Sequence, residues 1–125
     1  MAKILCVDDD PAAVQLKQAI LEKAGHTVST ASSAHEAMMK LENGEFDAVV
    51  TDWRLGDGDG RMVVQAAKAH ARVPVIVVSG FIEDAYKAAK PQADLYLEKP
   101  ADPKELLAIL NALLKTPRKT GEPGV

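Results

Sequence analysis

Residues 4–11 read ILCVDDDP, a short apolar run that stops at three aspartates and a proline. The apolar part has the length and unbroken hydrophobic character of a fully buried strand. Asp10 and Pro11 then have the form of a helix start, because aspartate caps a helix N-terminus and the first turn does not need the donor that proline lacks. Asp8 and Asp9 are therefore expected at the junction between a buried strand and a helix.

The same alternation of strand and helix continues along the chain. Short apolar runs predict five strands, at residues 3–7, 26–31, 48–52, 73–78 and 94–98. Amphipathic segments predict five helices, at residues 10–24, 33–43, 61–71, 83–90 and 102–114. Strands that alternate with helices favour an open, mostly parallel sheet with helices on both faces, and right-handed crossovers leave only a few doubly wound orders. We therefore expect an α/β fold.

Two helices carry more detailed predictions. The apolar positions of the first helix step by three and four residues and are expected to face the core: Ala13, Leu16, Ile20 and Ala24. Gly25 stands where a left-handed residue commonly ends a helix. Ser33 and Glu36 have the spacing of a capping box at the start of the second helix.

Length and composition agree with one globular domain. The chain has 125 residues, of which 47% are hydrophobic, 26% charged and only 4% aromatic, so the core must be aliphatic. The lone cysteine, Cys6, lies inside the first apolar run and is expected to be a buried hydrophobe rather than a reactive thiol. Residues 116–125 turn to Pro, Gly, Lys and Thr without periodicity, which indicates a flexible tail or a linker stub after a domain at residues 1–115.

The charge pattern excludes some classes of partner. Fifteen Lys and Arg against eighteen Asp and Glu give a net charge of −3, and the basic residues form no stripe. We therefore expect no direct binding to nucleic acid or to an anionic membrane. The chain has neither a signal-peptide core nor an apolar stretch near the ~20 residues that span a bilayer. The expected location is the cytoplasm.

Polar side chains follow four of the five predicted strands. Asp8 and Asp9 come after the first strand and Asp52 ends the third; Ser79 and Lys99 follow the fourth and fifth. Ligands of such folds bind beyond the carboxyl ends of the strands, so these side chains are expected to converge there.

Their chemistry points to a metal and a phosphoryl group. Three neighbouring carboxylates repel one another unless a cation lies between them. A set of oxygen ligands suits Mg²⁺, which binds through one or two carboxylates together with a phosphate. A carboxylate beside a metal and a lysine can also attack a phosphoryl group. The residues therefore indicate Mg²⁺-dependent phosphoryl transfer to an aspartate.

Four motifs carry a family resemblance across residues 3–114: ILCVDDDP, AVVTDWRLGDGDG, VIVVSG and LYLEKP. In this order and at these spacings they resemble the receiver domain of response regulators in bacterial two-component signalling. The resemblance implies a flavodoxin-like, three-layer α/β/α fold with a five-stranded parallel sheet in the order 2-1-3-4-5 and five helices.

The resemblance also implies a role for each residue of the metal site. Asp52 is expected to be the phosphoryl acceptor and a ligand of Mg²⁺. Asp9 would bind the metal directly, Asp8 mainly through water, and Arg54 through its backbone carbonyl.

Three further residues are expected to respond to the phosphoryl group. Ser79 would donate a hydrogen bond to its oxygens, and Lys99 would form a salt bridge with them. Tyr96 resembles the aromatic switch of the family, which turns inward when the hydroxyl of Ser79 moves towards the phosphate.

The partners implied by the resemblance are proteins. The phosphoryl donor would be a histidine kinase or a phosphotransfer protein, and the output a downstream effector protein or domain. The chain would act as a monomer or a weak phosphorylation-dependent dimer. It would catalyse only its own phosphorylation and dephosphorylation, without being an enzyme for other substrates.

Two alternative functions remain open at this stage. One is a small Mg²⁺-dependent phosphatase with Asp52 as nucleophile and Asp57 or Asp59 as the acid or base, although the chain has no room for a substrate cap. The other is a docking domain that acts independently of phosphorylation. The presence of the acidic pair, Asp52, Ser79 and Lys99 together disfavours this second alternative.

Two motifs also allow a second interpretation. Asp10 could be a third metal ligand, but its place before Pro11 favours capping. The glycine-rich run at 56–60 is interpreted as a turn rather than a phosphate or calcium loop.

Overall fold

A five-stranded parallel sheet forms the centre of the molecule. The structure is a computed structural model and describes residues 2–71, 73–80, 87, 93–99 and 102–115. The strands of the sheet are β1 (Lys3–Val7), β2 (Thr27–Ala31), β3 (Ala48–Asp52), β6 (Val75–Ser79) and β7 (Leu95–Glu98). Their order across the sheet is β2-β1-β3-β6-β7, which is the predicted 2-1-3-4-5 order counted over these five strands.

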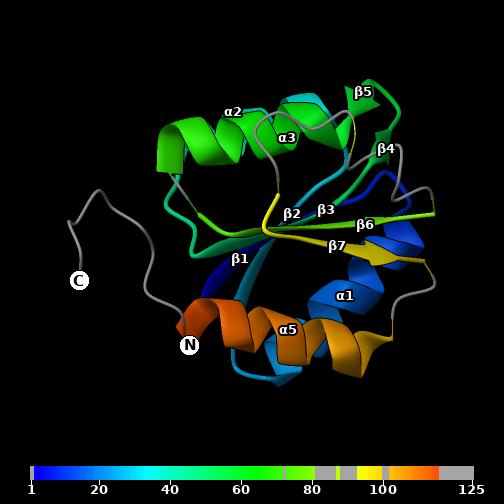
Figure 1. The fold of residues 1–125 in the computed structure, drawn as a ribbon, viewed down its shortest axis with the longest axis vertical. Helices are drawn as coiled ribbons and strands as arrows, with labels where there is room; N and C mark the ends of the chain where they lie inside the picture. The colour runs from blue at the N-terminus through cyan, green and yellow to red at the C-terminus, as the bar shows by residue number, and fades with distance from the viewer. Residues whose placement is uncertain (1, 72, 81–86, 88–92, 100–101, 116–125) are drawn as a thin grey trace.

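Helices cover both faces of the sheet (Figure 1). On one face lie α1 (Pro11–Lys23) and α5 (Pro103–Lys115). The opposite face carries α2 (Ala34–Asn43) and α3 (Gly60–Ala66), which continues into the π-helix η1 (Ala67–Ala71) where one uninterrupted helix was predicted. The predicted helix at 83–90, apart from the helical residue Lys87, and the predicted tail at 116–125 lie outside the described residues. No described helix is long and apolar enough to cross a bilayer.

The sheet separates two hydrophobic clusters, because successive side chains of a strand point to opposite faces. Leu5 and Val7 of β1 pack into the cluster beneath α2 and α3, whereas Ile4 and Cys6 pack into the cluster beneath α1 and α5. Burial raises the pKa of the Cys6 thiol to about 12, an effect that the nearby Lys17 charge only partly offsets. Cys6 is therefore an unreactive core residue, as predicted.

The predicted helix caps are present, with one difference. Asp10 accepts a hydrogen bond from the backbone N–H two residues ahead (3.0 Å), and Gly25 adopts the left-handed conformation with φ 97°. Ser33 Oγ accepts from the N–H of Glu36 at 3.0 Å, as a capping box requires. The Glu36 carboxylate, however, accepts from the N–H of Ser32 at 2.7 Å instead of that of Ser33. The reciprocal bond is thus shifted by one residue, because the Glu36 side chain is long enough to reach past the cap.

The predicted core face of α1 is wrong. Leu16 is 58% exposed and Leu21 is fully buried, while Val14 packs beside it against the α1–α5 cluster. Val14 and Leu21 define a stripe with Lys17 between them, and this charged residue hid the stripe from a search for apolar periodicity. Three of the four residues predicted to face the core, Ala13, Leu16 and Ile20, instead line a pocket of about 100 Å³ between α1 and α5, together with Lys17, Pro103 and Leu106. The fourth, Ala24, is exposed.

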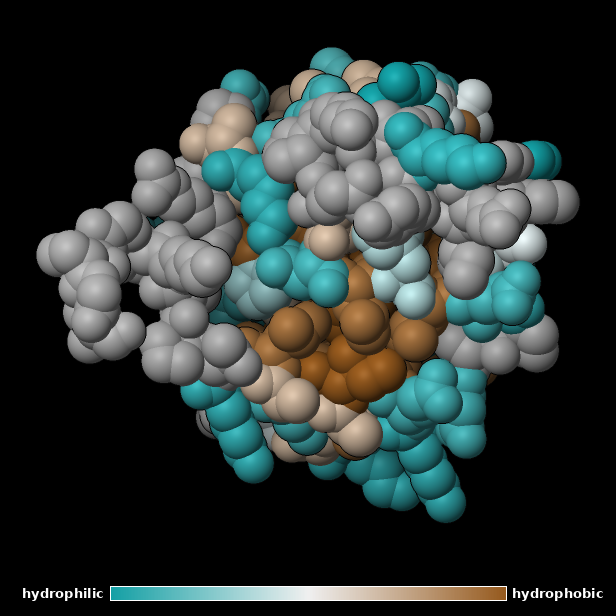
Figure 2. Space-filling view, viewed as in Figure 1, coloured by the Kyte–Doolittle hydropathy of each residue, from teal (hydrophilic) through white to brown (hydrophobic). Residues whose placement is uncertain are grey.

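Hydrophobic side chains gather on the visible surface between β7 and α5 (Figure 2). The half-buried apolar residues of these two elements include Leu95, Leu97, Ile109 and Leu113. This patch lies on the α1–α5 side of the sheet and is separate from the acidic site described next.

Candidate functional site

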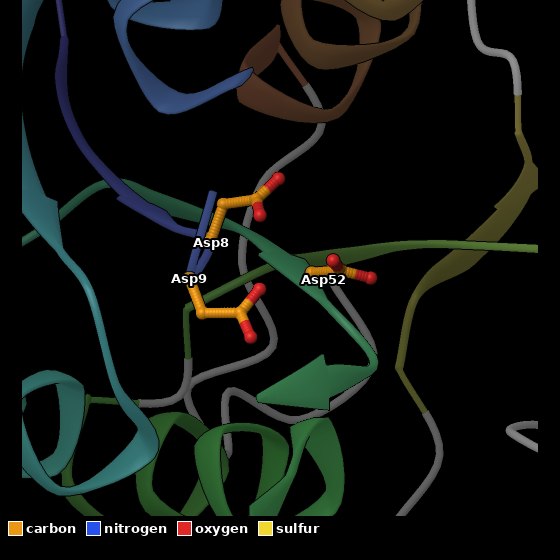
Figure 3. A group of neighbouring side chains, drawn as sticks. All are labelled: Asp8, Asp9 and Asp52. Carbon is orange, nitrogen blue, oxygen red and sulfur yellow. The ribbon is translucent and has the colours of Figure 1, made fainter. Parts of the chain in front are cut away.

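Three aspartates meet at the carboxyl ends of two neighbouring strands. Asp8 and Asp9 directly follow β1, and Asp52 is the last residue of β3, which pairs with β1 in parallel. One carboxylate oxygen from each aspartate lies within 4.8 Å of the others. Figure 3 shows the three side chains extending to the same side of the strand ends. The structure thus brings together the three carboxylates that the sequence placed after these strands.

Asp8 is almost completely buried, with 1% of its surface exposed. Its Oδ1 accepts a hydrogen bond from the backbone N–H of Asp10 at 3.0 Å, and its Oδ2 lies 3.1 Å from the ammonium of Lys17. A buried carboxylate is strongly destabilised unless it is paired and hydrogen-bonded. Asp8 therefore depends on Lys17 when no other cation is near.

Asp52 is also buried and has both oxygens engaged. Its Oδ1 accepts from the backbone N–H of Trp53 at 2.8 Å, and its Oδ2 accepts from Lys99 Nζ at 2.9 Å. Partial burial disfavours the charged form of Lys99, but the hydrogen bond and charge of Asp52 outweigh that effect and raise the pKa of Lys99 above its ordinary value. The Lys99 ammonium is consequently charged at physiological pH, directly beside the Asp52 carboxylate.

Asp9 differs from its two neighbours because it is exposed. Within the described residues, no hydrogen bond or ion pair holds its carboxylate. Asp9 is thus the most accessible carboxylate of the cluster for an incoming cation.

Ser79 and Lys99 lie at the same edge of the sheet as the aspartates. Ser79 ends β6, pairs with Glu98 in the register of β7, and is 1% exposed. Its backbone carbonyl accepts from the N–H of Lys99 at 2.9 Å. This bond fixes the ends of β6 and β7 beside Asp52, which pairs with Val78 one position away.

Tyr96 and Arg54 are the two remaining residues predicted to belong to the site. Tyr96 is half-buried in β7, packs against the cluster beneath α2 and α3, and accepts a hydrogen bond on its hydroxyl from the N–H of Ala93 at 3.0 Å. Arg54 is exposed in β4 (Arg54–Leu55), which forms a small antiparallel hairpin with β5 (Gly58–Asp59). The predicted turn at 56–60 is thus confined to residues 56 and 57, because Gly58 and Asp59 form β5 and Gly60 begins α3.

The two acidic residues of this hairpin serve as helix caps. Asp57 accepts hydrogen bonds from the backbone N–H groups of Ala34 and His35, each at 2.9 Å, so that it caps α2 from another part of the chain. The bond from His35, followed by that from Ala34, lowers the pKa of the Asp57 carboxyl. Asp59 caps α3 through the N–H of Arg61 at 3.0 Å. A general acid needs a raised pKa, so Asp57 is poorly suited to the role that the phosphatase alternative would give it.

Lys17 is the site residue that the sequence interpretation missed. A signal was present, because Lys17 lies between Val14 and Leu21 at helical spacing, and a lysine on a buried stripe is rarely without a partner.

The cluster suits a hard divalent cation. Its donor atoms are all carboxylate oxygens, and two of the three aspartates are buried against single lysines, Lys17 and Lys99. Oxygen ligands with room for water are what Mg²⁺ prefers in proteins. The residues present therefore fit a magnesium ion.

Comparison with known proteins points in one direction. The family model described as the response regulator receiver domain matches residues 4–111. The transcriptional regulatory protein ZraR of Salmonella typhimurium is 35% identical over 121 residues, which cover 94% of this chain and 27% of ZraR. This chain thus spans about a quarter of the length of that relative.

Solved structures agree with the sequence matches. A CheY-like receiver domain from Methanospirillum hungatei superposes with a TM-score of 0.84 at 32% identity, covering 91% of this chain and 94% of that one. The response regulator TrrA of Thermotoga maritima, solved in complex with Mg²⁺ and BeF, gives a TM-score of 0.82 at 25% identity over 90% of this chain and 99% of that one.

Proposed function

Because this chain belongs to the response regulator receiver domain family, which acts in phosphorylation-dependent two-component signalling, we propose that Asp52 is its phosphoryl acceptor. The observation that carries the proposal is the position of Asp52 in the acidic cluster, with Lys99 Nζ 2.9 Å from its Oδ2. A carboxylate held between acidic metal ligands and a lysine ammonium is suited to accept a phosphoryl group.

The metal site is assigned to Asp9, Asp52 and the backbone carbonyl of Arg54, with Asp8 acting mainly through water. Bound Mg²⁺ would offset the negative charge that gathers as the phosphoryl group approaches. The complex of TrrA with Mg²⁺ and BeF supports this assignment. Asp9 is the ligand most open to solvent, and Asp8 is held in place from behind by the N–H of Asp10.

Asp52 performs the transfer itself. An oxygen of its carboxylate forms a bond to phosphorus while the bond between phosphorus and the donor nitrogen of a phosphohistidine breaks, and that nitrogen keeps the electron pair. The N–H of Trp53 fixes the carboxylate through Oδ1, which leaves Oδ2 as the oxygen that faces Lys99. Lys99 then pairs with the transferred oxygens, and the Ser79 hydroxyl donates a hydrogen bond to them.

Phosphorylation of Asp52 would change the surface of the protein. Movement of Ser79 towards the phosphoryl group would open space for Tyr96, which is half-buried and packs against the cluster beneath α2 and α3. Such a two-state element shifts the surface around β7 and α5 and so alters partner binding. The donor is a histidine kinase or phosphotransfer protein, and the recipient is a downstream effector. The chain's own chemistry is limited to accepting the phosphoryl group and releasing it to water.

Intact-mass measurement tests the acceptor. We expect wild-type protein, incubated with Mg²⁺ and a small acyl phosphate, to gain one phosphoryl group. Asp52→Asn should gain none. Asp57→Asn, which alters a cap and leaves the acidic cluster intact, should gain the group as wild type does.

Two results would contradict the proposal. One is a phosphoryl gain in Asp52→Asn equal to that of wild type, and the other is no gain in wild type. Steady hydrolysis of a phosphomonoester by wild type, abolished in Asp57→Asn, would favour the phosphatase instead.

A further inference from the structure

Lys17 contacts the acidic cluster from the sheet-facing side of α1. It lies between Val14 and Leu21, and its side chain is only 15% exposed. Its ammonium lies 3.1 Å from Asp8 Oδ2. Lys17 is therefore a partly buried cation whose position is set by the packing of α1 against the sheet.

Each oxygen of the Asp8 carboxylate already has a hydrogen-bond partner. Oδ1 accepts from the N–H of Asp10 at 3.0 Å, and Oδ2 accepts from Lys17. A divalent cation that shares Asp8 with its water ligands must compete with the Lys17 ammonium for this carboxylate. Two positive charges close to one oxygen also repel each other in a partly buried site.

Lys17 has space to withdraw. Its side chain lines the pocket of about 100 Å³ between α1 and α5. The lining is otherwise apolar and includes Leu16 and Leu106, so it can accept the methylene stem of a lysine while the ammonium stays in water. The pocket therefore offers space into which the Lys17 side chain could move away from Asp8.

We propose that Lys17 is an internal counter-cation that holds Asp8 in the metal-free protein and thereby weakens the affinity of the site for Mg²⁺. The inference rests on the proposed function, since it requires that the cluster binds Mg²⁺. In the metal-free state Lys17 neutralises a buried carboxylate. In the metal-bound state the same charge opposes the cation, so the residue adjusts the Mg²⁺ concentration at which the receiver becomes competent.

Removing the charge of Lys17 should increase the affinity for Mg²⁺ and decrease the stability of the metal-free protein. Lys17→Met keeps most of the stem and removes the ammonium. We expect it to bind Mg²⁺ about tenfold more tightly, the order expected for one unit charge near the surface at close range. We also expect its metal-free form to melt at a lower temperature than wild type, and Mg²⁺ to raise that melting temperature by more than it does in wild type.

A Mg²⁺ titration followed by Trp53 fluorescence measures the affinity. Trp53 is the only tryptophan, it is buried, and its backbone N–H donates to Asp52, so its emission is expected to respond to a cation bound at the site. Lys23→Met is the matched control, because it makes the same change in charge at an exposed position of the same helix. We expect its dissociation constant to stay within about twofold of wild type, since exposed charges at a distance are screened. Lys17→Gln provides a second variant if Lys17→Met does not fold.

The outcomes separate this inference from the proposed function. A dissociation constant for Lys17→Met and Lys17→Gln that equals or exceeds that of wild type overturns the role of Lys17, even if wild type binds Mg²⁺ normally. If wild type shows no saturable response to Mg²⁺, or if Asp9→Asn responds as wild type does, the metal site itself is wrong and both proposals fail.

Discussion

At the scale of single residues, the three aspartates of the site are held by different groups. Asp8 is bonded to Lys17, Asp52 is bonded to Lys99, and Asp9 is open to solvent. The site therefore has two carboxylates that are paired with lysines and one that is accessible to a cation. This division follows from position, since Asp52 is the last residue of β3 and Asp8 is the first residue after β1, whereas Asp9 lies one residue further out.

Asp57 carries a prediction about pH. Its folded-state pKa is lowered, first by the N–H of His35 and then by that of Ala34, so its charged form stabilises the native state. The contribution is present above the unfolded pKa of about 4 and is lost as the pH falls through the folded value. We expect Asp57→Asn to have a lower free energy of unfolding than wild type at pH 7, and the difference to be smaller at pH 3. Urea unfolding at both pH values measures it, and a difference independent of pH would contradict the cap.

At the scale of elements, α3 begins in direct contact with the end of β3. The N–H of Gly60 donates to the carbonyl of Trp53 at 2.6 Å. A Cβ at Gly60 would lie 2.8 Å from the backbone oxygen of Asp52 and 3.0 Å from the Trp53 ring. Glycine at this position therefore allows the first turn of α3 to pack against the proposed acceptor.

Two glycine variants test this contact. Gly60→Ala should lower the free energy of unfolding by about 2 kcal/mol, because the added methyl collides with backbone that cannot move freely. Gly58→Ala is the control, since the one close contact of its Cβ would be with the flexible end of Met62, at 2.8 Å from the sulfur, while the Cβ of Ala34 lies at an ordinary 3.9 Å. We expect it to cost about 0.5 kcal/mol or less. Gly60→Ala should also take up the phosphoryl group more slowly, and equal unfolding free energies for the two variants would refute the close approach.

The elements also show what could be predicted from the sequence. The five strands of the sheet and the caps at Asp10 and Ser33 were predictable because they depend on neighbours in the chain. The core face of α1 was not, because its buried side includes Lys17, whose partner Asp8 becomes visible only once the helix is packed on the sheet. A search for apolar periodicity assigns every charged residue to the surface, so it predicts the wrong buried face for such a helix.

At the scale of the whole molecule, the parallel sheet explains why the convergence of these side chains was predictable and their contacts were not. Asp8, Asp52, Ser79 and Lys99 lie at the carboxyl ends of strands or directly after them, and parallel strands place those ends at one edge. Contacts between distant elements depend on packing instead. Asp57 caps α2 from 23 residues away in the sequence. The ring of His26 is hydrogen-bonded to the side-chain amide of Asn111, which is 85 residues away. No local pattern in the sequence encodes either pair.

Different hydrophobic clusters support different residues around the site. The cluster beneath α2 and α3 holds Trp53 and packs against Tyr96, whereas the cluster beneath α1 and α5 supports Lys17 through the neighbours Val14 and Leu21. Residues next to the site therefore belong to both clusters, Trp53 to one and the neighbours of Lys17 to the other.

Mapping the modified residue tests the assignment of Asp52 most directly. Borohydride reduces an aspartyl phosphate to homoserine, which marks the acceptor permanently for peptide mass analysis. After incubation with Mg²⁺ and a small acyl phosphate, we predict homoserine at position 52 of the wild-type chain, and none there when Mg²⁺ is removed by a chelator. Homoserine at position 8, 9 or 57 in its place, or an unmodified Asp52 in protein that has gained a phosphoryl group, would contradict the assignment.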